Sequence, residues 1–78
     1  MLGDFMIETR LRDLREKHDL KQKDIAEVLK IPSHTYSNYE LGIRGIPLDI
    51  LIDIAKFYNT STDYILKVTD EIKAYPRA

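Results

Sequence analysis

The sequence predicts an all-α fold, and two observations support this prediction. Apolar residues recur at helical spacing along the chain, and no segment shows the strict alternation of a half-buried strand. A second spacing recurs four times, with an apolar or part-apolar residue followed by another five positions later: Leu20/Ile25, Ile31/Tyr36, Ile46/Leu51 and Thr60/Ile65. Because this is the spacing of a hydrophobic staple at a helix N-terminus, the four pairs predict four helix starts.

Length and composition narrow the class of protein. The 78 residues suffice for one small domain, whose core is only marginally adequate alone, and 44% of them are apolar. The chain has no cysteine and two histidines, so we expect no disulfide, no metal site and no other cofactor. No apolar run reaches the roughly 20 residues of a membrane span, and residues 1–4 lack the blocks of a signal peptide. These features predict a cytoplasmic protein.

The first predicted helix covers about residues 7–18. Ile7, Leu11 and Leu14 form its apolar face, and the sequence places its end at Asp19 and Leu20. The charged side chains of this helix are expected to face water: Arg10, Arg12, Glu16 and Lys17.

Two short helices follow, over about residues 22–29 and 33–40, with a tight break between them. Ile25, Ala26 and Leu29 share one face of the earlier helix, and Ala26 is small enough for a second helix to approach closely. Tyr36 and Tyr39 face inward by periodicity, which favours core packing over stacking on bases. The outward side chains of the later helix are small, neutral and rich in hydrogen-bonding atoms, as a contact surface requires: Ser33, His34, Ser37 and Asn38.

A fourth helix is predicted over about residues 47–58, and a fifth from about residue 62 to 66 or 68. Gly42 and Gly45 can end the third helix and turn the chain, because glycine accepts left-handed conformations. The fourth helix is apolar on nearly all sides; Asn59 is expected to stop it and Ser61 to cap the fifth. We expect one domain over residues 1–68 and a short C-terminal tail over residues 69–78.

The formal net charge is −1, whereas nucleic-acid-binding domains are usually basic. Four cations nevertheless bracket the two short helices, against acidic residues at 24, 27 and 40: Lys21, Lys23, Lys30 and Arg44. The C-terminal half is acidic. The charge pattern therefore predicts one modestly positive face and argues against a strongly electrostatic, non-specific nucleic-acid binder.

These features in this order resemble the lambda-repressor and Cro type of helix-turn-helix domain, called the XRE family. The similarity spans about residues 11–66 without a gap, beginning with the segment LRDLR at 11–15. It continues through matched positions of consistent spacing: Gln22, Ile25, Ala26, Leu29, Ile31, Thr35, Ser37, Tyr39, Glu40, Gly42, Leu51, Ile54, Ala55 and the stop Asn59-Thr60-Ser61.

The resemblance implies a five-helix lambda-repressor-like bundle in which helices two and three form the helix-turn-helix. Residues 1–68 would then be the DNA-binding domain, with helix three in the major groove. The positions matching Ser33, His34 and Asn38 would contact base edges. The chemistry fits, because an Asn amide can pair bidentately with adenine, and Ser or His can form single hydrogen bonds.

The resemblance also implies contacts with the DNA backbone. The position matching Gln22, at the start of helix two, would hold a phosphate, and a helix N-terminus attracts anions. Further phosphate candidates are Lys21, Ser37, Tyr39 and Arg44. Arg15 and Glu40 match a pair that forms a structural ion pair between helices one and three.

The chain departs from the family pattern at three positions. Lys21 and Pro32 replace the usual Ser or Thr caps, and Lys30 replaces a turn glycine. Since proline has no capping oxygen, helix three could begin one residue later with Ser33 as its cap. Ser33 therefore has two candidate roles, capping its own helix or contacting DNA.

The leading functional hypothesis is a sequence-specific DNA-binding regulator, a repressor acting as a homodimer on double-stranded operator DNA. One short helix reads few base pairs, and two-fold operators place half-sites about 34 Å apart. Apolar residues in excess of the small core would support a dimer: Ile50, Ile54, Phe57, Tyr64 and Leu66. The alternative is a protein-interaction module of the same fold, such as an antitoxin or partner-binding regulator, which the acidic C-terminal half favours. We expect no enzyme, because no nucleophile, base and oxyanion site can be assembled.

Overall fold

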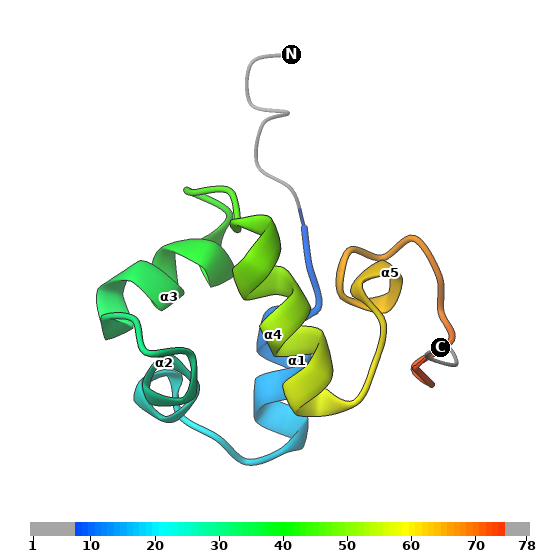
Figure 1. Cartoon of the computed structure of the whole chain (residues 1–78), viewed down its shortest axis with the longest axis horizontal. Helices are drawn as coiled ribbons and strands as arrows, with labels where there is room; N and C mark the ends of the chain where they lie inside the picture. Colours follow the sequence, from blue (N-terminus) through cyan, green and yellow to red (C-terminus); the bar gives the residue numbers. More distant parts are fainter. Residues whose placement is uncertain (1–7, 75–78) are drawn as a thin grey trace.

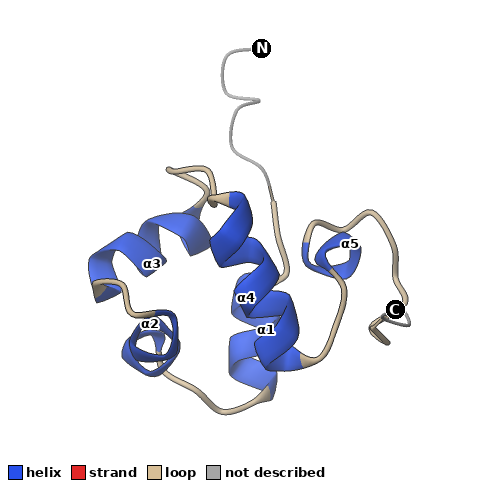
Figure 2. Cartoon of the chain, in the orientation of Figure 1, coloured by secondary structure: helices blue, strands red, loops and turns tan. Residues whose placement is uncertain are grey.

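Residues 8–74 are described by the computed structural model, and they contain five α-helices and no strand (Figure 1, Figure 2). This confirms the predicted all-α fold. The helices are α1 (Leu11–Lys17), α2 (Gln22–Leu29), α3 (Ser33–Leu41), α4 (Leu48–Tyr58) and α5 (Thr62–Ile65). Their bounds lie within three residues of the predicted ones, except at the start of α1.

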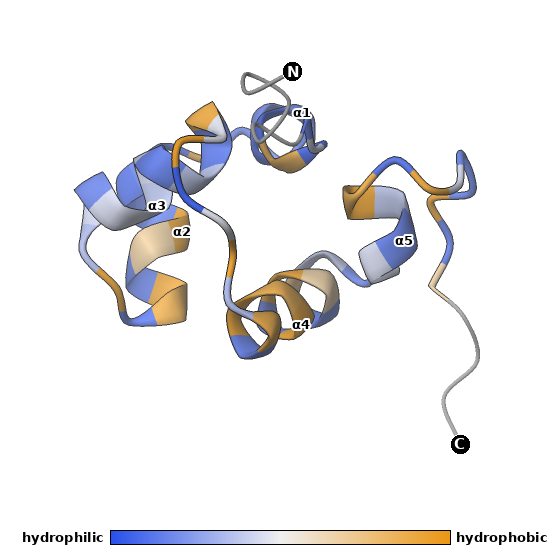
Figure 3. Cartoon of the chain, turned by 90° about the horizontal axis from the view of Figure 1, so that it is seen from above, coloured by the Kyte–Doolittle hydropathy of each residue, from blue (hydrophilic) through white to orange (hydrophobic). Residues whose placement is uncertain are grey.

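The helices surround one core. Figures 1 and 3 show α2 and α3 on one side of the molecule, α5 on the opposite side, and α1 and α4 between them. The most extensive helix pair is α2 with α3. All five helices supply buried side chains to the core: Leu11, Leu14, Ile25, Ala26, Leu29, Tyr36, Tyr39, Leu51, Ile54, Ala55, Tyr58 and Ile65.

All four predicted staples are found at helix N-termini. Leu20, Ile31, Ile46 and Thr60 each precede an N-cap residue, and the residue five positions later is buried in every case. Ser61 caps α5 as predicted, since its hydroxyl accepts a hydrogen bond from the Tyr64 amide at 3.0 Å. In α2 the Asp24 carboxylate instead accepts from the backbone amide of Lys21 at 2.8 Å. Local sequence therefore fixes where four helices begin.

The predicted start of α1 is wrong, because residues 8–10 are not helical and the helix begins at Leu11. Ile7 lies outside the described residues. The backbone amide of Arg10 donates to the Ile65 carbonyl at 2.8 Å, and the Thr9 hydroxyl accepts from the Leu11 amide at 3.3 Å. Pairing with α5 thus replaces the first turn of the predicted helix.

Arg10 does not face water, contrary to expectation. Its side chain is 16% exposed, and its guanidinium donates to the carbonyls of Tyr64 and Thr69 and to the Asp70 carboxylate at 2.7 Å. The same group lies 4.2 Å from the centre of the Tyr64 ring. Farther along, the Thr60 hydroxyl donates to the Ile72 carbonyl. Residues 69–72 are therefore held against the helices by the hydrogen bonds of Arg10 and Thr60.

The turns between helices use left-handed residues. Lys30, Gly42 and Asn59 end α2, α3 and α4 with φ of 61°, 76° and 55°. Asn59 is the predicted stop of α4, and Gly42 the predicted end of α3. Lys30 carries a side chain where glycine would be unstrained, so this turn costs about 1 kcal/mol relative to glycine.

We predict that Lys30→Gly raises the free energy of unfolding by about 0.5–1 kcal/mol, because relief of the left-handed strain exceeds the added freedom of the unfolded chain. Chemical denaturation measures this change. The matched control is Lys56→Gly in the last turn of α4, which has right-handed helical geometry; its free energy of unfolding should fall by up to about 1 kcal/mol. A loss of stability on Lys30→Gly would show that the turn is not strained.

Candidate nucleic-acid interface

The outward face of α3 carries the predicted polar residues. Ser33 and His34 are exposed, Ser37 and Asn38 are half-buried, and Tyr36 and Tyr39 point into the core. The helical periodicity brings the four polar side chains onto one side of α3. Their amide, imidazole and hydroxyl groups offer donors and acceptors together, which is what base edges require.

Ser33 is not the cap of α3. The N-cap is Pro32, with φ −64° and ψ 149°, and no side chain caps the helix. Ser33 is the first helical residue, and it is exposed. Its hydroxyl makes no hydrogen bond within residues 8–74, so the capping role considered for Ser33 is not found there.

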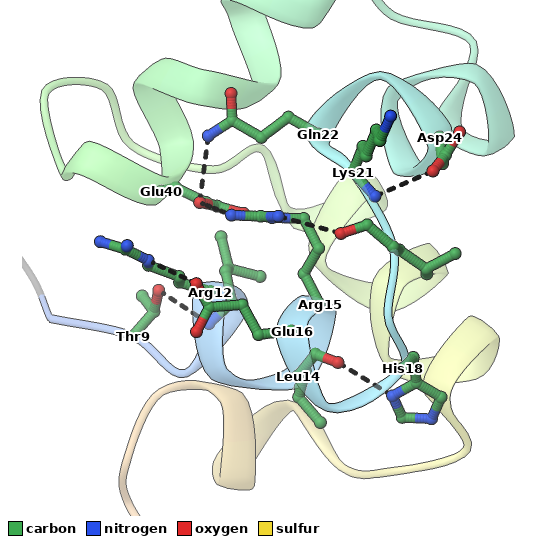
Figure 4. Close-up of polar contacts among 12 residues, drawn as sticks. Thr9, Arg12, Leu14, Arg15, Glu16, His18, Lys21, Gln22, Asp24 and Glu40 are labelled. Carbon is green, nitrogen blue, oxygen red and sulfur yellow. Dashed lines mark hydrogen bonds and ion pairs between the residues drawn. The ribbon is translucent and has the colours of Figure 1, made fainter.

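Arg15 and Glu40 join α1 to α3 (Figure 4). The guanidinium binds the carboxylate with two hydrogen bonds, Nε to Oε2 at 2.6 Å and Nη2 to Oε1 at 3.2 Å. A third donor of Arg15, Nη1, bonds the Leu20 carbonyl at 2.9 Å. The two side chains are 14% and 4% exposed. Breaking a pair this well shielded from water strongly lowers the stability of the fold, since either partner alone would be an uncompensated buried charge.

Gln22 belongs to the same network. Its Nε2 donates to Glu40 Oε1 at 3.1 Å, and Figure 4 shows its amide oxygen pointing away from the carboxylate. Glu40 therefore connects three helices: α1 through Arg15, α2 through Gln22, and α3 by its own backbone. We call Arg15, Gln22 and Glu40 the three-helix network. It fixes the position of the first turn of α2 relative to α3.

The three-helix network changes the pKa values of Glu40 and of two neighbouring tyrosines. Burial alone would raise the pKa of Glu40, but the hydrogen bonds it accepts, led by Arg15, outweigh burial and hold that pKa below its usual value. Burial and the charge of Glu40 raise the pKa of Tyr36 far above its ordinary range, and that of Tyr58 to about 12. The carboxylate is therefore ionised and both phenols are neutral at neutral pH.

The predicted phosphate contacts occupy different surroundings. Lys21 and Arg44 are exposed, as are Lys23 and Lys30, and none of the four forms an ion pair within residues 8–74. Unpaired exposed cations are free to bind an anion. Tyr39 is only 5% exposed, so its ring belongs to the core and only its hydroxyl end could meet a phosphate.

Leu41 was not among the sequence candidates. It is the last residue of α3, it is 57% exposed, and helical geometry puts it on the same side as Ser37 and His34. An apolar side chain there can meet a thymine methyl group or the sugar edge. Its spacing of four from Ser37 could have revealed it.

The structure shows where the apolar residues in excess of the core lie. Of the five residues expected not all to fit the core, Ile54 is fully buried. Ile50, Tyr64 and Leu66 pack partly against the core, and Phe57 is 42% exposed. Larger exposed fractions occur elsewhere: Leu41 57%, Ile43 67%, Leu48 70% and Val68 71%.

A short helix packed on a second helix, with a polar contact face turned outward, defines a helix-turn-helix domain. The sequence profile of the family described as Helix-turn-helix matches residues 11–65. The chain therefore belongs to this family, and the predicted resemblance to its XRE type is confirmed.

Curated relatives carry regulator names. The chain is 42% identical over 62 residues to the uncharacterized HTH-type transcriptional regulator YobD of Bacillus subtilis, covering 80% of this chain and 55% of that protein. It is 42% identical over 57 residues to the HTH-type transcriptional regulator ImmR of the same species, covering 73% and 45%. With the cryptic phage CTXphi transcriptional repressor RstR of Vibrio cholerae it shares 36% over 53 residues, covering 68% and 48%.

The chain thus spans about half the length of the curated relatives it matches. No solved structure matches it significantly. Within residues 8–74 the longest helix is α4 with 11 residues, and none there could cross a bilayer.

We predict that Glu40→Gln lowers the free energy of unfolding at pH 7 by about 3 kcal/mol, because it leaves the Arg15 charge buried without its partner. The pKa of Glu40 is below its ordinary value of 4.5, so its contribution is complete above about pH 4.5 and is lost as the pH falls through the folded-state pKa. The difference between wild type and variant should therefore shrink below pH 4.5. Denaturation across a pH series measures it.

The control is Glu16→Gln, which breaks the exposed Arg12–Glu16 pair at 3.0 Å. It should change stability by less than about 1 kcal/mol, because exposed ion pairs are screened by water. If both variants lost the same free energy of unfolding, the buried Arg15–Glu40 pair would contribute no more to stability than an exposed ion pair.

Proposed function

We propose that this chain is a sequence-specific DNA-binding transcriptional regulator, a repressor, which inserts α3 into the major groove. The observation that supports it best is the polar outward face of α3, with its helix fixed against α1 and α2 by the buried Glu40 carboxylate. Membership of the helix-turn-helix family and the regulator names of its relatives support the same class of function.

Base reading is assigned to Ser33, His34 and Asn38. The Asn38 amide nitrogen can donate to adenine N7, and its amide oxygen can accept from the adenine N6 amino group, which makes a bidentate pair. Ser33, with a hydroxyl that no cap interaction uses, and exposed His34 can each add a single hydrogen bond. Three such contacts discriminate only a short half-site, so a second copy is required for operator specificity.

Phosphate contacts are assigned to Lys21, Gln22, Ser37, Tyr39 and Arg44. Gln22 stands at the first position of α2, where backbone amides and the helix dipole favour an anion. Its amide nitrogen has a second hydrogen besides the one given to Glu40. Lys21 and Arg44 add exposed positive charge near the two ends of the α2–α3 unit.

The regulator is proposed to act as a homodimer in the cytoplasm. Because the net charge is −1 and only one face is expected to be modestly positive, direct contacts rather than bulk attraction are the main source of affinity.

Selection of bound duplexes from random DNA tests the proposal, followed by titration of the selected duplex at two salt concentrations. We expect an enriched two-fold sequence and binding that weakens steeply with salt. If no sequence is enriched and the protein shows no preference over random DNA at low salt, the DNA-reading function is wrong. Tight binding to a co-purified protein in that case would favour the alternative, a protein-interaction module.

We predict that Asn38→Ala costs about 1–3 kcal/mol on the selected duplex and relaxes the preference at one base position. Gln22→Ala should weaken binding to all duplexes alike, because phosphates carry no sequence information. Fluorescence titration against a panel of single-base variants measures both effects.

Lys73→Ala is the control, since Lys73 is exposed and follows α5, the helix that Figure 1 shows on the opposite side of the molecule from α3. It should leave both affinity and preference unchanged. An unaltered base preference after Asn38→Ala would overturn the assignment of Asn38 to base reading.

A further inference from the structure

The segment between α3 and α4 combines a hollow with protruding apolar side chains. The hollow has a volume of about 310 Å³, and its walls include Tyr39, Ile46, Leu51 and Leu66. Ile43 stands in the same wall and is 67% exposed, and Leu48, two residues after Ile46, is 70% exposed. Figure 3 shows this segment as apolar stretches separated by a hydrophilic one.

This combination suits a second copy of the same chain. In a two-fold interface each copy presents the same patch, so a projection must lie beside the recess that receives its counterpart. Ile43 and the hollow meet that condition within one short segment. A small molecule bound in the hollow would leave the exposed parts of Ile43 and Leu48 in water, whereas a second copy would cover both.

The charges on the patch are also self-complementary. Arg44 follows Ile43, and Asp49 lies one residue after Leu48 in the first turn of α4. Both are exposed, and neither forms an ion pair within the part of the chain that the structure describes. Across a two-fold axis, Arg44 of each copy can face Asp49 of the other, so that both unlike charges find partners.

We propose that the α3–α4 segment is the homodimer interface, with Ile43 of each copy seated in the hollow of the other and Arg44 paired with Asp49 across the axis. This inference rests on the proposed homodimer and assigns it a surface. Because the segment continues directly from α3, the interface lies next to the DNA-reading helix. Arg44, a proposed phosphate contact, then lies at the dimer interface as well.

Sedimentation velocity over a dilution series, without DNA, tests the interface. Ile43→Asp should raise the dimer dissociation constant by more than about tenfold, because it buries an unpaired charge in an apolar recess. Val68→Asp is the matched control, since Val68 is equally exposed at 71% but lies after α5. It should change the constant by less than about threefold.

Charge reversal gives a second, independent test, because it does not change the apolar contact of Ile43 with the hollow. Arg44→Asp and Asp49→Arg should each weaken the dimer, and the double variant should restore it. The double variant should still bind the selected duplex more weakly than wild type, because its proposed phosphate contact is lost.

Two results would overturn the inference. A dimer that is disrupted by Val68→Asp and not by Ile43→Asp would place the interface elsewhere while leaving the homodimer intact. A wild-type chain that is a monomer at every concentration would remove both the interface and the free homodimer. The first result leaves the DNA-reading proposal intact. The second would remove its free homodimer, whereas base reading by α3 is tested separately by duplex selection.

Discussion

The buried carboxylate of Glu40 is the interaction on which the arrangement of the helix-turn-helix depends. Helix α3 buries only Tyr36 and Tyr39 in the core, and its outward face is polar. Apolar packing alone therefore gives it a weakly defined orientation. The bidentate bond from Arg15 and the hydrogen bond from Gln22 supply the missing constraint. A polar network that is fully satisfied can specify one arrangement where apolar contacts permit several.

The structural features that the sequence could predict are those set by residues close together along the chain. Staple pairs such as Ile31/Tyr36, the Ser61 cap and the Asn59 stop act within one helical turn, so their spacing determines the structure directly. Arg10 could not be predicted in this way, because its partners Tyr64, Thr69 and Asp70 lie 54 to 60 positions along the chain. Only the packing of α5 against the start of α1 brings them together.

The candidate site was predictable to a similar degree. Periodicity alone placed Ser33, His34 and Asn38 outward, and the resemblance to the XRE type named Arg15 and Glu40 as partners. Neither showed that Gln22 shares the Glu40 carboxylate, because that contact depends on how α2 and α3 pack in three dimensions. The sequence also could not show that Pro32 is the N-cap of α3. Residue preference argues against proline at an N-cap, and only the backbone angles of Pro32 identify it.

The most direct test of the account maps the DNA contact on the folded protein. Backbone amide resonances are followed by NMR while a duplex selected from random DNA is added. We expect the largest shifts in α3 and the first turn of α2, with little change over residues 62–74. The account would be contradicted if the largest shifts fell on α5 and the segment after it while those of α3 stayed unchanged.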